Sequence, residues 1–305
     1  MTYIITGATS FLGVELAQAL IQQGHQVTAI CRPDSHGLRN LPKRVKIIHG
    51  QMDEYGTLDT KIAHTDVFVH LAWSGTGHDG RDATQVQQEN IAYSLDAMRA
   101  ASKMGCQLFV MAGSQAEYGS TTLPQQEDMH CEPFSEYGKA KLQMWEEGKQ
   151  LAEELGMKYL HLRIFSLFGE TDHAWTLVMS CVDKMLRNEP MDLSACTQNW
   201  NFLYVKDAAR QIATLCNYAV ETDNYKSEIY QIASEDTREL KDFVERMKEL
   251  TGTKSELHYG AVVPAHLVSL QPNMQKTKAV VNPLVAYDFD AVIKRIIAKN
   301  YDKSI

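Results

Sequence analysis

The sequence YIITGATSFLG, at residues 3–13, predicts a buried strand that passes through a glycine turn directly into a helix. The strand is Tyr3–Thr6, and the helix extends over Phe11–Gln23. Gly7 permits the tight turn, and Gly13 lets the helix pack closely against the sheet. Free N–H groups at a helix N-terminus favour an anion, so this arrangement predicts a site for the pyrophosphate of a dinucleotide.

The rest of the chain alternates short apolar runs with segments of helical period, which is typical of a parallel sheet covered by helices on both faces. We therefore expect an α/β fold, with a Rossmann-type doubly wound parallel sheet and a smaller, mostly C-terminal substrate domain. Residues 1–169 with about 200–234 are the expected first domain, and about 170–199 with 235–305 the second. Later strands are predicted at 27–31, 45–49, 66–72, 107–112, 158–165, 202–205 and 228–233, and later helices at 87–105, 135–155, 175–186, 206–218 and 239–250.

Composition limits the partners and the compartment. The chain has 305 residues and a formal net charge of -8, so we expect no nucleic-acid partner, because phosphate contacts need a basic surface. No apolar run approaches the roughly 20 residues of a membrane span, and the first strand begins too early for a signal peptide. The six cysteines are far apart and form no metal motif with the histidines, which indicates a cytoplasmic protein without a metal.

Tyr137 and Lys141 lie four residues apart at the predicted start of a helix, and this spacing places both on one helix face. A free phenol has a pKa of about 10 and transfers protons poorly near neutral pH. A neighbouring ammonium and an oxidised nicotinamide favour the phenolate and bring the group toward working pH. The pair therefore predicts proton transfer.

The glycine loop followed by this pair resembles the extended short-chain dehydrogenases/reductases, the NAD(P)-dependent epimerase/dehydratase family. Its loop usually reads T-G-x-x-G-[FY]-[IL]-G, and here TGATSFLG has Ser10, a small residue able to hydrogen-bond a phosphate, at the middle glycine. The family pattern [ST]-x-x-x-Y-G matches residues 114–119. The resemblance implies that Ser114 orients the reacting oxygen, that Tyr137 transfers the proton, and that Lys141 also holds the nicotinamide ribose.

The resemblance extends over nearly the whole chain and implies further site residues. LRIFSLFG at 162–169 is similar to the family run L-R-x-x-N-x-x-G, and WNFLYVKD at 200–207 to R-D-F-[IV]-[YH]-V-x-D. The expected cofactor-binding residues are Gly7, Thr9, Ser10, Phe11, Leu12, Gly13, Arg32, Gln51, Met52, Leu71, Ala72, Asn90, Tyr137, Lys141 and Phe165. The expected substrate-binding residues are Trp73, Gln115, Ser166 and Trp200.

Besides Ser10, three of these positions depart from the family pattern. Ser166 replaces an Asn and Trp200 an Arg, two positions that often grip the diphosphate of the substrate, and Gln51 replaces an Asp that contacts adenine. A sugar nucleotide is the expected substrate. A substrate without a nucleoside diphosphate is the alternative that these departures leave open.

The end of the second predicted strand bears on the choice of cofactor. An acidic residue there would hold the ribose 2′-hydroxyl of NAD. This chain has no carboxylate at Ala29–Cys31, and Arg32 follows. Because an arginine can fork to a 2′-phosphate and stack on adenine, we expect NADP, with NAD as the second choice.

Three functions remain for this set of residues. Gln115 and Ala116 stand where the family's 4,6-dehydratases carry an Asp–Glu pair, so dehydration is not expected. The NADP assignment favours a reductase that acts on a keto-sugar, with Tyr137 as general acid. An NAD-dependent epimerase with the same site and a non-catalytic NADP sensor are the alternatives.

The surroundings of the site and the assembly are also expectations. Family members commonly dimerise through four helices, and the helices predicted at 87–105 and 135–155 are the candidates for a homodimer interface. Packing or a loop position is an equal alternative for each residue that we considered for the substrate cleft beside Trp73. These are Glu117, Tyr118, His78, His173 and Trp175.

Overall fold

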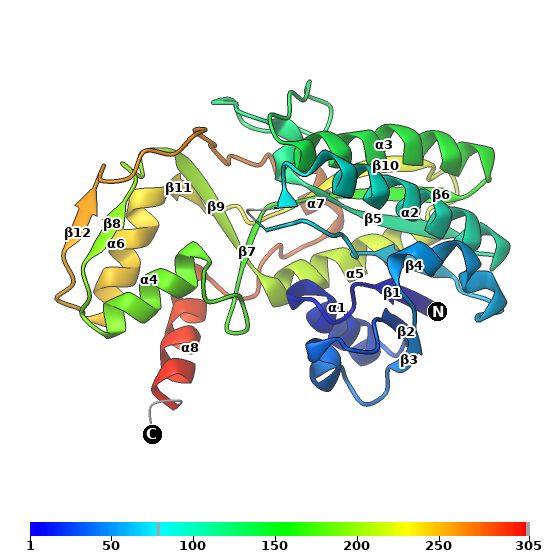
Figure 1. The fold of residues 1–305 in the computed structure, drawn as a ribbon, viewed down its shortest axis with the longest axis horizontal. Coiled ribbons are helices and arrows are strands. Elements are labelled where there is room, and N and C mark those ends of the chain that lie inside the picture. Colours follow the sequence, from blue (N-terminus) through cyan, green and yellow to red (C-terminus); the bar gives the residue numbers. More distant parts are fainter. Residues whose placement is uncertain (78–79, 303–305) are drawn as a thin grey trace.

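The structure is a computed structural model, and it describes residues 1–77 and 80–302. It has two lobes: a large one built on a seven-stranded sheet, and a smaller one that contains most of the C-terminal third (Figure 1). Within the described ranges, no helix combines the length and apolar character that crossing a bilayer requires.

The seven-stranded sheet has the order β10-β6-β5-β4-β1-β2-β3, and all its strand pairs are parallel. Helices cover both faces of this sheet, and its central strands β1, β4 and β5 are almost entirely buried, as the sequence predicted for parallel strands. The doubly wound α/β fold is therefore confirmed. The strands are β1 (Thr2–Thr6), β2 (Gln26–Cys31), β3 (Lys46–His49), β4 (Val67–His70), β5 (Leu108–Ser114), β6 (Lys158–Ile164) and β10 (Ser227–Ile232).

The strand order reverses between β1 and β4, which places a crevice at the carboxyl ends of these two strands. Helices α1 (Phe11–Gln22) and α5 (Val205–Glu221) cover one face of the sheet, and α2 (Thr84–Lys103) and α3 (Glu136–Glu154) the other (Figure 1). Each helix turns an apolar stripe to the sheet, so the core forms two layers, one on each face.

The smaller lobe contains two short sheets. One has the order β11-β9-β7 and the other pairs β12 with β8. The chain enters this lobe after β6, returns to the large sheet through α5 and β10, and then enters it again. Its elements are β7 (Ser166–Phe168), α4 (Leu177–Leu186), β8 (Met191–Leu193), β9 (Asn199–Tyr204), β11 (Thr237–Glu239), α6 (Leu240–Thr251), β12 (Leu257–Tyr259) and α8 (Phe289–Asp302), and α7 (Gln275–Val280) lies against β10.

The sequence pattern missed several elements of the smaller lobe. The strands β7, β8, β11 and β12 have three residues each, too few to show a period of two. Helix α8 does have buried apolar residues at helical spacing, at Val292, Ile293 and Ile296. It follows a segment with prolines at 264, 272 and 283, and we predicted no helix beyond that segment.

Candidate active site

The glycine turn between β1 and α1 is shaped by two close backbone approaches. Gly7 has φ of +67°, and a Cβ there would lie 2.7 Å from the backbone nitrogen of Ala72. A Cβ on Gly13 would lie 2.3 Å from the Gly7 carbonyl oxygen. Ser10 caps α1, because its Oγ accepts a hydrogen bond from the Gly13 N–H at 3.0 Å. Its hydroxyl hydrogen stays available to a phosphate.

A cavity of about 390 Å³ opens beside this turn. No acidic residue lies in the first turn of α1, so the positive end of its dipole and its free N–H groups suit a pyrophosphate. The residues present therefore fit a dinucleotide. Of the predicted site residues, those that line the cavity are Ser10, Phe11, Leu12, Leu71, Trp73, Ser114, Gln115, Tyr137, Lys141, Phe165 and Ser166.

Arg32 and Thr9 lie where the end of β2 approaches the glycine turn. Arg32 is exposed. Ser35 donates a hydrogen bond to the Thr9 Oγ1 at 2.7 Å, and a Cβ on Gly37 would lie 2.4 Å from the Thr9 carbonyl oxygen. The segment after β2 thus packs directly on the dinucleotide turn.

Asn90, Gln51 and Met52 lie near the segment that follows β4. Asn90 is buried and exchanges two hydrogen bonds of 2.9 Å with the backbone of Ser74. The Ser74 hydroxyl donates to the Met52 sulfur at 3.6 Å, and Gln51 begins a short 3-10 helix over Met52–Thr60. Asn90 therefore shapes this segment and does not line the cavity.

Ser114, Tyr137 and Lys141 come together on the cavity wall. Ser135 caps α3 by accepting from the Gly138 N–H at 3.1 Å, which fixes the helix start that carries Tyr137 and Lys141. The Lys141 Nζ donates to the Ala112 carbonyl at 2.7 Å. Ser114, at the end of β5, hydrogen-bonds the phenol.

Burial governs the protonation of this group. It raises the pKa of Tyr137, and the Ser114 hydrogen bond and the Arg81 charge only partly oppose it. Burial also lowers the pKa of Lys141 to about 7. The phenol therefore keeps its proton at neutral pH, which is the form that donates.

The side chains of Trp73 and Arg81 pack against Tyr137 and Lys141. The Lys141 Nζ lies 3.5 Å from the centroid of the Trp73 ring, and this ring meets Tyr137 edge-on at 6.4 Å. The Arg81 guanidinium lies 4.3 Å from the centroid of the Tyr137 ring, and Gln87 holds the Trp73 Nε1–H at 2.8 Å. No sequence motif marks Arg81, which lies in a loop, or Gln87, which occurs within a helix.

Two residues considered for the cleft lie elsewhere. Glu117 is 0% exposed and Tyr118 is 3% exposed, and neither lines the cavity. The short helix Gln115–Tyr118 turns both side chains inward, behind Ser114. The packing alternative therefore holds for both, because a residue that follows a strand end can turn toward the core as well as toward the ligand.

Other substrate candidates are divided between the cavity and the surface. His173 lines the cavity, whereas Trp175 is 72% exposed. Trp200 is half-buried in the small sheet, away from the lining, and its Nε1 has no hydrogen-bond partner among the described residues. His78 lies outside the described residues. Across the described ranges, no three His, Cys, Asp or Glu side chains are grouped to hold a metal ion.

The doubly wound sheet, the glycine turn at its switch point and the Ser114–Tyr137–Lys141 group define a Rossmann-fold protein that binds a nicotinamide dinucleotide. Residues 3–233 match the sequence model of the NAD dependent epimerase/dehydratase family, and the chain belongs to this family. The resemblance seen in the sequence motifs is therefore confirmed.

Individual relatives are distant but cover most of the chain. It is 24% identical to the CDP-abequose synthase of Salmonella muenchen over 264 residues, 85% of this chain and 84% of that protein. A UDP-N-acetylglucosamine 4-epimerase from Methanobrevibacter ruminantium, solved with UDP-N-acetylmuramic acid, has a TM-score of 0.87 at 20% identity over 99% and 98% of the two chains. The UDP-glucuronic acid 4-epimerase from Bacillus cereus, solved with UDP-glucuronic acid and NAD, has a TM-score of 0.83 at 20% identity over 100% and 99%. At these identities the structural likeness establishes the fold.

Proposed function

We propose that the protein is an NADP-dependent oxidoreductase that reduces a keto-sugar, in particular a nucleotide-linked 4-keto-sugar. The observation that carries this proposal is the meeting of Ser114, a protonated Tyr137 and Lys141 in one cavity beside the N-terminus of α1. A nucleotide-linked substrate is supported by the relative named CDP-abequose synthase and by the UDP-sugars in the solved complexes.

Each residue of the catalytic group has a separate role in a carbonyl reduction. When bound, the reduced nicotinamide supplies a hydride to the carbonyl carbon. Tyr137 gives its proton to the carbonyl oxygen, so that the product is an alcohol. The Ser114 Oγ accepts from the Ala116 N–H at 3.1 Å, so its single hydrogen would turn from the Tyr137 phenol to the carbonyl oxygen when substrate binds. Lys141, in its cationic form, stabilises the phenolate that remains.

A 4,6-dehydration does not form part of the proposal. That reaction needs an acid and a base beside the catalytic hydroxyl. Gln115 lines the cavity and Ala116 is buried beside it, and neither side chain can exchange a proton.

An NAD-dependent sugar-nucleotide epimerase is the second candidate. It is favoured by the match to two solved 4-epimerases, one of them holding NAD. The same three residues would serve it, with Tyr137 taking the hydroxyl proton and then returning it. The two candidates differ in whether the cofactor is consumed.

A substrate screen tests the proposal. We expect the protein to oxidise NADPH, followed at 340 nm, when it is given a 4-keto-6-deoxyhexose linked to CDP, dTDP or UDP. Tyr137→Phe should lower kcat by about 10²- to 10⁴-fold, the usual contribution of a general acid. Tyr218→Phe, which changes a partly exposed tyrosine on α5, is the matched control and should leave kcat unchanged.

Each outcome of the screen selects one function. Formation of a sugar epimer without net change in the cofactor would replace the reductase by the epimerase. Tight NADP binding with no turnover of any sugar, and no effect of Tyr137→Phe, would favour the sensor.

A further inference from the structure

A buried carboxylate lies behind Ser114, and the proposed reaction does not use it. Glu117 is 0% exposed. Its Oε1 accepts hydrogen bonds from the Ser114 backbone N–H at 2.8 Å and from the His161 Nε2 at 2.9 Å. Its Oε2 accepts from the Arg163 Nε at 2.7 Å. Both oxygens of a fully buried anion are therefore satisfied.

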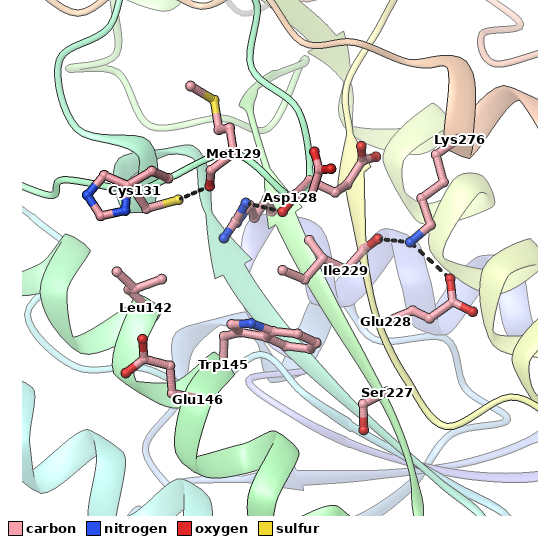
Figure 2. Close-up of a pocket in the computed structure, with 13 residues that line it drawn as sticks. Asp128, Met129, Cys131, Leu142, Trp145, Glu146, Ser227, Glu228, Ile229 and Lys276 are labelled. Carbon is pink, nitrogen blue, oxygen red and sulfur yellow. Dashed lines mark hydrogen bonds and ion pairs between the residues drawn. The ribbon is translucent and has the colours of Figure 1, made fainter.

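Arg163 is itself held at both ends of its guanidinium. It is 2% exposed, lies over the Tyr118 ring at 4.5 Å, and donates from Nη1 to the Glu127 carbonyl at 2.9 Å. Its side chain also lines a second cavity of about 460 Å³ between α3, β10 and residues 127–131. Figure 2 shows this cavity, with Trp145 and Ile229 on its wall. The network thus extends from that cavity to the catalytic end of β5.

Gly113 shows how closely the network approaches β5. A Cβ on this residue would lie 2.3 Å from the His161 Nε2 and 2.5 Å from the Glu117 Oε1. The strand has no side chain there because the carboxylate and the imidazole occupy the space. Ser114 follows directly, with its N–H held by Glu117 and its Oγ by the Ala116 N–H.

A buried ion pair of this kind needs an explanation beyond stability, because an apolar replacement of similar volume is often as stable. We propose that Glu117 is a positioning residue of the active site, which fixes Ser114 at the end of β5 and places a negative charge behind Tyr137 and Lys141. The inference rests on the proposed redox function and deepens it.

The charge of Glu117 acts on both catalytic groups in a direction that suits reduction. Burial is the main influence on each, and the Glu117 charge raises the pKa of Tyr137 and the pKa of Lys141. Tyr137 thereby keeps the proton that it donates, and Lys141 stays cationic to higher pH. The ionisable groups around Glu117 are His161, Arg163 and Tyr159 on β6, Tyr118, Cys131, and Tyr137 and Lys141 on α3.

Two substitutions separate position from charge. Glu117→Gln keeps the length and the acceptor for the Ser114 N–H but removes the charge, so the basic limb of the kcat profile should move down by about 1 pH unit. Glu117→Asp keeps the charge but is too short to hold Ser114, so kcat should fall about tenfold with both limbs unmoved. The KM for NADPH should stay the same in both variants.

A direct titration gives a readout that needs no substrate. In protein labelled with ¹³Cζ-tyrosine, the Tyr137 signal is assigned by its loss in Tyr137→Phe. We expect it to titrate at lower pH in Glu117→Gln. Glu146→Gln is the matched control. It removes an exposed carboxylate from α3, the helix that carries Tyr137, and should leave the Tyr137 signal unchanged.

A double variant separates the effect of the lost Glu117 charge from that of misfolding caused by an unpaired Arg163. Glu117→Gln leaves Arg163 without its counter-charge, whereas Glu117→Gln/Arg163→Met removes both charges and should also lower the Tyr137 titration. An unmoved Tyr137 signal in every folded variant that lacks the Glu117 carboxylate, or an unchanged kcat in Glu117→Asp, would overturn the assignment. If the parent protein turns over no sugar at all, the proposed reaction fails, and the tyrosine titration still decides the charge effect.

Discussion

At the residue scale, burial of the Lys141 ammonium in the active site lowers the stability of the folded protein, because the charge loses its hydration. Its side chain is 2% exposed, and burial lowers its pKa from 10.5 to about 7. The Ala112 carbonyl and the Trp73 ring compensate for part of the lost water. Between these two pKa values the unfolded chain binds more protons than the native protein, so the contribution of Lys141 to stability rises with pH.

We therefore expect Lys141→Met to abolish activity and yet to stabilise the protein in acid. The cost of the buried charge is fully present below pH 7 and fades toward pH 10.5, so the variant should have the higher Tm at pH 6 and a shrinking advantage above pH 7. Thermal unfolding of both proteins from pH 6 to 10 measures this. Lys149→Met, on the exposed side of α3, serves as the control, and a less stable Lys141→Met at pH 6 would contradict the argument.

At the scale of elements, the segment after β2 packs against the glycine turn between β1 and α1. Ser35 and Gly37 pack on Thr9 and hold the segment in place, and Arg32 projects from it into solvent. No acidic side chain stands at the end of β2 to bind a ribose 2′-hydroxyl. An exposed arginine at this place suits a 2′-phosphate better than a 2′-hydroxyl.

We expect the protein to bind NADP more tightly than NAD and Arg32→Asp to reverse this order. A charge-assisted hydrogen bond contributes about 1.5–3 kcal/mol, so the NADP Kd should rise more than tenfold. Titration of both cofactors by intrinsic fluorescence measures the two constants. Arg39→Asp, on the following 3-10 helix, is the control for a general charge effect, and tighter binding of NAD by the parent would contradict the NADP assignment.

At the scale of the whole molecule, the outer faces of α2 and α3 are the surface through which the family resemblance implies a homodimer. The two helices lie side by side over one face of the sheet (Figure 1). Their exposed positions are mostly polar, and Ala92 is a small exposed residue on α2. An interface there would be isologous, with each helix pair meeting its own copy.

We expect sedimentation equilibrium to give twice the chain mass of 34.4 kDa. Ala92→Arg should halve that mass, because a bulky charged side chain would then stand on the outer face of α2, within the expected interface. Gln26→Arg, at an exposed position on β2 away from these helices, should leave the mass unchanged. A parent protein that sediments as a monomer would exclude this assembly.

The separate residues show where sequence reasoning succeeds and where it ends. Tyr137 and Lys141 share one helix, so helical spacing was enough to place them on one face, whereas Ser114, two residues beyond the predicted strand 107–112, was assigned by the family resemblance. Trp200 also lies in a recognisable motif, yet the strand that carries it belongs to the small sheet and lies away from the cavity lining. Its surroundings depend on a crossing between lobes that no local pattern encodes.

From the sequence by itself, the glycine turn at residues 3–13 and the apolar runs that follow it determined the doubly wound sheet, because these depend on backbone freedom and on the period of apolar residues. Tertiary structure alone decided that Arg81 stacks on Tyr137, that Trp73 covers Lys141, and that Glu117 pairs with Arg163. Such contacts join residues far apart in the chain. Their energies depend on burial and on distance, which only the packed protein sets.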